Sequence, residues 1–126
     1  MGNKNRRPEV RLCIRTVLYA ACRTFYEKVL GLKIFSEWDR ESLDRGVVYE
    51  IEGSLLELLE SKKENATTLD GSFYLYIEVP DVERYRVELE AKGVRTSPLV
   101  TTAWHHKSFD IADPAGMKLT FFTKMA

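Results

Sequence analysis

The sequence has few of the features that mark secreted, membrane-spanning or nucleic-acid-binding proteins. It holds 2 cysteines and 4 prolines among 126 residues. No apolar run approaches the ~20 residues that span a bilayer. Its 19 Lys and Arg residues balance its 19 Asp and Glu residues, so the formal net charge is zero. This balance gives no support for nucleic acid or an anionic membrane as a partner.

The start of the chain and its cysteines indicate a reducing compartment. Residues 1–8 are polar, lack the apolar core of a secretory signal, and are expected to form a flexible tail. Cys13 falls on a predicted strand and Cys22 on a predicted helix, so both are expected to be reduced core residues. A disulfide between them stays open, because spacing alone cannot decide it. We therefore expect a cytoplasmic protein.

One stretch, residues 24–34, joins the end of a helix to the start of a strand through a glycine. Phe25 and Val29 lie on one helical stripe, and Gly31 can adopt the left-handed conformation that closes a helix. A second helical stripe, followed by Gly93 and an extended run, repeats the event. Two such units in a short chain predict an internal repeat.

Periodicity predicts the same order of elements, β-α-β-β-β, in each copy. The expected elements of the first copy are strands at 10–16, 32–38, 46–51 and 54–60 and a helix at 18–30. Those of the second are strands at 73–79, 94–97, 107–112 and 117–123 and a helix at 82–92. Residues 54–60 also fit a helical face, but the hairpin turn expected at Gly53-Ser54 favours a strand.

Three pairs of residues relate the two copies by a nearly constant offset of 62 or 63 residues: Arg11 and Tyr74, Gly31 and Gly93, Glu57 and Thr120. The fold class is therefore α+β. We expect a single domain at 9–126 after the tail, with module one at 9–60, a linker at 61–71 and module two at 72–124.

Four short motifs occur in order along the chain: Phe25-Tyr-Glu-Lys-Val-Leu-Gly-Leu32, Val79-Pro-Asp-Val82, Lys92-Gly-Val94 and Asp113-Pro-Ala-Gly116. Together they resemble the landmarks of the vicinal oxygen chelate superfamily, which includes glyoxalase I, extradiol dioxygenases and the bleomycin- and fosfomycin-resistance proteins. The resemblance covers about residues 9–124. It implies two β-α-β-β-β modules that form a curved mixed sheet around a cavity, often at a dimer interface, with helices on the convex face.

The resemblance also implies where a divalent metal would bind. Enzymes of this superfamily use four side chains, usually His or Glu, from the first and last strands of each module. The corresponding positions here are Arg11, Glu57, Tyr74 and Thr120, and only Glu57 is a usual ligand. A guanidinium repels a cation, and neutral Tyr and Thr hydroxyls are poor ligands for zinc, nickel or iron(II). We therefore expect no metal cofactor, with one divalent metal at Glu57 as the alternative.

Glu57 is the best candidate for a catalytic acid, although a structural salt bridge with Arg11 explains it equally well. If such a pair is fully buried, removing Arg11 alone is expected to cost ~3 kcal/mol of stability. Arg11 also suits an anion clamp for a ligand carboxylate or phosphate.

Aromatic residues of the second copy suit a flat or apolar ligand. Alternation places Tyr74 and Tyr76 on one face, with Thr120 and Phe122 of the last strand beside them. His106 is a candidate base with Glu57, or an exposed loop residue, and Trp104 a candidate lid or interface anchor. Core packing or a dimer contact explains the aromatic residues almost as well.

The leading hypothesis is a metal-free, homodimeric protein that binds a small molecule, either a drug or a metabolite. The predicted ligand-binding residues are Arg11, Glu57, Tyr74, Tyr76, Trp104, His106, Thr120 and Phe122. The second hypothesis is a metal-dependent lyase, isomerase or dioxygenase with rearranged ligands, and the third a structural or regulatory module with a filled cavity. The sequence leaves open the ligand and whether the modules pair within one chain or between two.

Overall fold

A computed structural model describes residues 9–41, 44–62 and 73–125. The chain divides into two compact units, residues 1–66 and residues 67–126, and each is described by itself. The predicted tail at 1–8 and most of the predicted linker at 61–71 lie outside the described residues. In the described part, no helix is long and apolar enough to cross a membrane.

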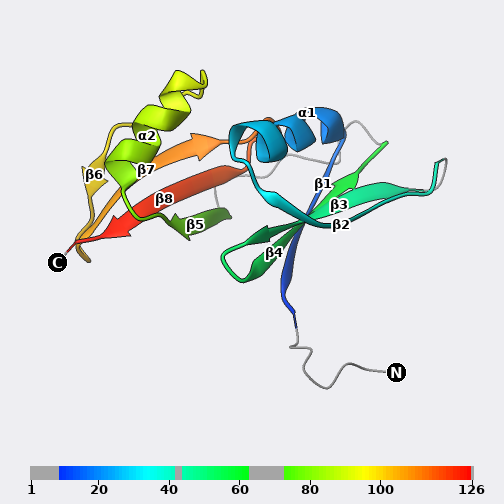
Figure 1. Cartoon of the computed structure of the whole chain (residues 1–126), viewed down its shortest axis with the longest axis horizontal. Helices are drawn as coiled ribbons and strands as arrows, with labels where there is room; N and C mark the ends of the chain where they lie inside the picture. Colours follow the sequence, from blue (N-terminus) through cyan, green and yellow to red (C-terminus); the bar gives the residue numbers. More distant parts are fainter. Residues whose placement is uncertain (1–8, 42–43, 63–72, 126) are drawn as a thin grey trace. The chain divides into compact units, whose positions relative to one another are not determined.

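The first unit is a four-stranded mixed sheet with one helical segment on it (Figure 1). Its elements are β1 (Arg11–Thr16), α1 (Tyr19–Thr24), the π-helix η1 (Phe25–Val29), β2 (Lys33–Asp39), β3 (Arg45–Ile51) and β4 (Ser54–Glu60). The strand order is β1-β4-β3-β2, with β1 parallel to β4 and the other neighbours antiparallel.

The second unit repeats this topology with the order β5-β8-β7-β6, and β5 is parallel to β8. Its elements are β5 (Tyr74–Glu78), α2 (Val82–Ala91), β6 (Val100–Thr101), β7 (His106–Ala112) and β8 (Lys118–Lys124). The predicted α+β class and the β-α-β-β-β order of both modules are confirmed, and residues 54–60 form a strand.

Local signals explain where several elements end. The Asp81 side chain accepts a hydrogen bond from the Arg84 N–H at 3.1 Å and caps α2. Gly93 has a φ of 84° just after α2, as a helix stop requires. The β3–β4 turn consists of Glu52 and Gly53 and not of Gly53-Ser54, and both of its residues have positive φ.

Two predicted elements differ from the structure. The helix expected at 18–30 changes from α to π geometry at Phe25. The strand expected at Val94–Ser97 is not formed, and β6 begins only at Val100. Ser97 does contact β7, since its N–H donates to the Asp110 carbonyl at 3.0 Å. Pro98 follows and has no N–H, so a regular ladder cannot continue through it.

The two faces of each sheet differ in what covers them. In the second unit the Tyr85 ring of α2 packs on Phe121 and Phe109, with centroids 4.8 and 6.5 Å apart. In the first unit Tyr26 of η1 packs on Tyr49 of β3 at 5.6 Å. Because side chains alternate along a strand, the neighbours of these residues point to the opposite face of each sheet. We call it the helix-free face, because no helix among the described residues of the same unit covers it. The predicted site residues on the strands lie on these helix-free faces.

Candidate ligand-binding site

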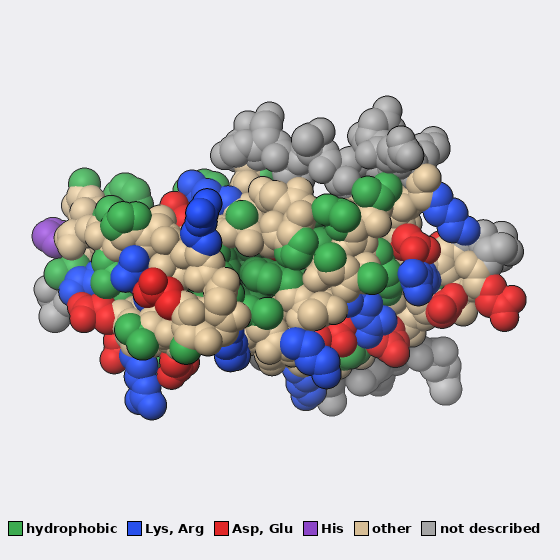
Figure 2. Space-filling view, turned by 90° about the horizontal axis from the view of Figure 1, so that it is seen from above, with side chains coloured by type: hydrophobic (Ala, Val, Ile, Leu, Met, Phe, Trp, Pro, Cys, Tyr) green, Lys and Arg blue, Asp and Glu red, His purple; other side chains and the backbone are tan. Residues whose placement is uncertain are grey.

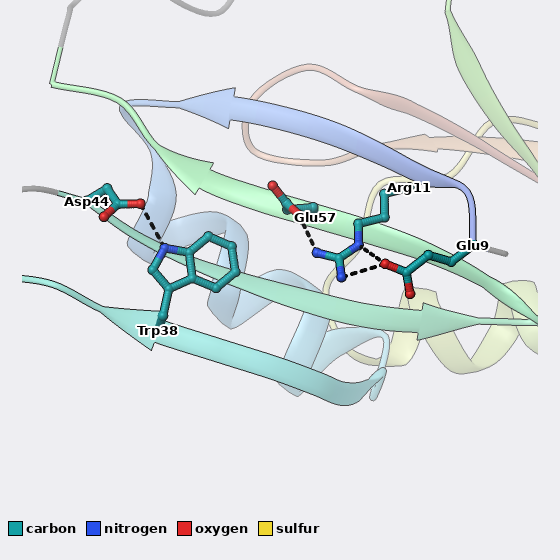
Figure 3. Close-up of polar contacts among 5 residues, drawn as sticks. All are labelled: Glu9, Arg11, Trp38, Asp44 and Glu57. Carbon is teal, nitrogen blue, oxygen red and sulfur yellow. Dashed lines mark hydrogen bonds and ion pairs between the residues drawn. The ribbon is translucent and has the colours of Figure 1, made fainter. Parts of the chain in front are cut away.

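The Arg11 guanidinium lies between two carboxylates on the helix-free face of the first unit (Figure 3). Its Nη1 donates to Glu57 Oε1 at 2.7 Å, and its Nε donates to Glu9 Oε1 at 2.8 Å. These two hydrogen bonds, that to Glu57 first, raise the pKa of Arg11 further above its usual range. The predicted pairing of Arg11 with Glu57 is therefore confirmed as a contact.

Cys13 lies opposite Glu57 in the pairing of β1 with β4, and it is exposed. The expectation that both cysteines are core residues is wrong for Cys13, because it shares the polar face of β1 with Arg11 and Arg15. Partial desolvation of the thiol, and then the nearby Glu57 carboxylate, raise the pKa of Cys13. Cys22, on α1, is fully buried as expected.

Trp38 also lies on the helix-free face of the first unit, and the sequence interpretation missed it. Its partner in the β2–β3 ladder is Gly46, which in turn pairs with Leu59 of β4. A Cβ atom at Gly46 would lie 2.5 Å from Cζ2 of Trp38, so the indole covers the glycine. The Trp38 Nε1–H donates to Asp44 Oδ2 at 2.9 Å, which holds the ring in place (Figure 3).

The donor set at the four predicted positions does not fit a divalent metal. The one usual ligand, Glu57, already holds a guanidinium at 2.7 Å. The Thr120 hydroxyl donates to Asp110 Oδ1 at 2.7 Å, and the Tyr74 ring packs against the Lys118 ammonium at 4.6 Å. Within the described ranges, no three His, Cys, Asp or Glu side chains gather as a metal site requires.

Replacing Arg11 with methionine is expected to lower the free energy of unfolding by about 1 kcal/mol or less. The Arg11 and Glu57 side chains are 31% and 15% exposed, so the ~3 kcal/mol expected of a fully buried pair does not apply. Urea denaturation measures the change, with the exposed Arg84→Met on α2 as control. A loss above about 2 kcal/mol would contradict this view of the pair as partly solvated.

Three rings are stacked on the helix-free face of the second unit. Tyr76 lies 4.1 Å from Phe122 with 16° between the planes, and His106 lies 4.5 Å from Phe122 with 13°. The Tyr76 and His106 centroids are 5.7 Å apart, which is less than those two distances together. Phe122 is therefore not sandwiched: Tyr76 and His106 lie side by side over it and leave it 7% exposed.

A polar network ties Trp104 to this stack, and we name these four residues, Tyr76, Trp104, His106 and Phe122, the aromatic cluster. The Trp104 Nε1–H lies 3.1 Å from both the Tyr76 hydroxyl oxygen and His106 Nδ1. The Tyr76 hydroxyl is 2.7 Å from the same Nδ1. The ring atoms of Trp104 remain largely accessible, since this residue is 61% exposed.

The turn between β6 and β7 positions Trp104. The Thr102 N–H donates to the His106 carbonyl at 2.8 Å, and the His106 N–H donates to Thr102 Oγ1 at 2.9 Å. His105 has a φ of 64°, a conformation that only a few per cent of non-glycine residues adopt. The chain thus reverses between Thr102 and His106 and carries Trp104 next to Tyr76.

The first unit contains a cavity of about 240 Å³. It is lined by Tyr19, Arg23, Glu37, Trp38, Asp39 and Arg45. None of the predicted site residues lines it. Several of its side chains are committed to other partners: Arg23 donates to Glu27 and Glu37, and Arg45 to Glu60.

The structure thus gathers the predicted site residues into two groups. Arg11 and Glu57 form an ion pair in the first unit, while the other six lie within the second. Tyr74 is edge-on to Tyr76 at 6.5 Å, beside the aromatic cluster. Thr120 is buried and engages Asp110, so its hydroxyl faces the sheet's own side chains. The His106 ring contacts Tyr76, Trp104 and Phe122.

Comparisons with solved structures give the same fold. A glyoxalase family protein from Enterococcus faecalis is 23% identical, with 94% of this chain and 98% of that chain covered and a TM-score of 0.73. A lactoylglutathione lyase from Agrobacterium tumefaciens is 17% identical, with 95% and 96% covered and a TM-score of 0.70. An antibiotic binding protein from Streptomyces sp. CB03234 is 15% identical, with 98% and 100% covered and a TM-score of 0.73.

At these identities the likeness shows the fold alone. The comparison with curated proteins gives no match. The family comparison matches residues 10–121, nearly the whole chain, to a sequence family. The chain therefore belongs to the Glyoxalase/Bleomycin resistance protein/Dioxygenase superfamily.

Proposed function

We propose that this chain binds a small, flat molecule, a drug or a metabolite, without a metal cofactor. The observation that carries the proposal is the aromatic cluster, in which Tyr76 and Trp104 are 38% and 61% exposed although their polar atoms are engaged with each other and with His106. Aromatic faces left accessible in this way suit a planar ligand. The antibiotic binding protein with the same fold supports this proposal by analogy of fold.

Tryptophan fluorescence tests the binding, because the chain has 2 tryptophans and Trp38→Phe leaves Trp104 as the only reporter. A panel of planar aromatic compounds should include members that quench Trp104. Tyr76→Ala in this background should weaken their binding about tenfold, since stacking on an aromatic face contributes about 1–1.5 kcal/mol. Val87→Ala on α2, at a residue that is 65% exposed, is the matched control. Equal binding by both variants would contradict the proposal.

The metal-free part rests on the Arg11 guanidinium, which supplies the positive charge beside Glu57. Elemental analysis of protein purified without chelator, repeated after adding zinc, nickel, manganese or iron(II), should find no stoichiometric metal. One tightly held metal per chain, lost in Glu57→Ala, would instead favour the second candidate, a metal-dependent lyase, isomerase or dioxygenase.

We further propose that the protein is a cytoplasmic homodimer and that neither nucleic acid nor a membrane is its partner. Two edge strands bound each described sheet, and proteins usually cover such edges. On the face shown in Figure 2, Lys and Arg side chains are interspersed with Asp and Glu side chains. Light scattering at high micromolar concentration should give the mass of two chains, and a monomer would refute the dimer.

A further inference from the structure

The hydrogen bonds of the aromatic cluster decide which nitrogen of His106 carries the proton. An indole N–H can only donate, and the Trp104 N–H is directed at both the Tyr76 oxygen and His106 Nδ1. The Tyr76 hydroxyl accepts this bond, so its own proton is available for Nδ1 at 2.7 Å. Two donors therefore converge on Nδ1, which must be unprotonated. The neutral imidazole then carries its hydrogen on Nε2.

The Nε2–H group is the polar atom that the cluster leaves available. All interactions of His106 involve its backbone, its ring face or Nδ1, and in the part of the chain that the structure describes Nε2 has no hydrogen-bond partner. The residue is half-buried. The Tyr76 hydroxyl and the Trp104 N–H are both engaged within the cluster. A ligand stacked here would thus meet aromatic faces and one donor.

The charged groups around the cluster do not favour either sign. Lys124 is the ladder partner of His106, and its ammonium lies 3.9 Å from Glu78. Lys118 lies 3.9 Å from Asp110. Among the described residues of the second unit, two ammonium groups and two carboxylates balance on this face. The selectivity of the face therefore depends on the hydrogen bond more than on net charge.

We propose that His106 Nε2–H is the ligand-orienting donor of this site, and that the ligand class is planar aromatic compounds with an oxygen acceptor attached to the ring, such as a carbonyl. This inference rests on the proposed function and names the kind of molecule it would take. A ligand that lacks the acceptor leaves the donor desolvated and unpaired, which disfavours its binding.

The test uses two ligands of nearly the same shape, 2-acetylnaphthalene and 2-isopropenylnaphthalene, in which a carbonyl oxygen is exchanged for a methylene group. Equilibrium dialysis with the full chain should show about tenfold tighter binding of the ketone, as expected for one hydrogen bond. In His106→Phe, which keeps a ring over Phe122, the ratio of the two affinities should fall to about one. His106→Gln, whose amide can place a donor near Nε2, should restore part of the preference.

The neighbouring histidine gives a matched control. His105→Asn keeps a residue that tolerates positive φ and should leave the preference unchanged. Equal binding of the two ligands to the wild type, or a preference that persists in His106→Phe, would overturn this inference and leave the proposed function standing. If neither ligand binds the wild type, the proposed function fails at this face and the inference fails with it.

Discussion

Replacing Phe122 with alanine should destabilise the protein by about 3 kcal/mol, the low end for a large buried aromatic residue. Its ring is 7% exposed and is covered by Tyr76 and His106 at 4.1 and 4.5 Å. Alanine would leave a space under both rings and remove the surface that aligns them. Urea denaturation measures the stability. In the Trp38→Phe background, Trp104 fluorescence should shift because the network that holds its indole loses its support.

Phe122→Leu is the matched variant, since it keeps most of the buried volume and removes only the stacking. It should cost clearly less than Phe122→Ala and still weaken the binding of flat ligands. A Phe122→Ala protein as stable as the wild type would mean that Tyr76 and His106 do not depend on this ring. The proposed binding face would then not depend on the Phe122 ring beneath Tyr76 and His106.

The second large effect is expected at Gly46, where alanine should cost about 2 kcal/mol. The new Cβ would lie 2.5 and 2.8 Å from Cζ2 and Cη2 of Trp38 and 3.0 Å from the Leu58 carbonyl oxygen. The indole cannot simply move away, because its N–H is bonded to Asp44 at 2.9 Å. The backbone oxygen of Leu58 belongs to the neighbouring strand and cannot yield either.

A double-mutant cycle identifies which contact causes the loss of stability in Gly46→Ala. In a Trp38→Ala background the Gly46→Ala substitution should cost much less, because only the contact with Leu58 remains. The same cost in both backgrounds would show that the penalty arises from the strand backbone and not from the indole.

For residues on the regular strands, the sequence correctly predicted which side chains share a face of the sheet. Alternation placed Tyr76 and Phe122 on one face, and the 62- or 63-residue offset placed Glu57 and Thr120 at equivalent positions of the two modules. The structure has both relations, with Cys13 opposite Glu57 and Tyr76 opposite Thr120 in the two parallel ladders. Such relations follow from a period of two and a repeated module, which are local properties of the chain.

The packing of the Trp38 ring over Gly46 could not be predicted from the sequence, because it depends on the register between β2 and β3. Whether an indole near the end of β2 lies over a glycine or over a bulky residue is settled only by pairing with Gly46 in a different strand. The missing strand at Val94–Ser97 is a similar case. The apolar pattern fitted a strand, but Pro98 and the placement of β7 restrict the ladder to Val100–Thr101.

The α+β class and the duplicated β-α-β-β-β order could be predicted from the sequence alone. These depend on periodicity and turn residues, which act over a few residues or repeat along the chain. That Trp104, Tyr76 and His106 share one hydrogen-bond network is evident only from the folded chain. Those residues come from β5, β7 and the turn before β7, and their hydrogen bonds exist only after the sheet has brought them within about 3 Å.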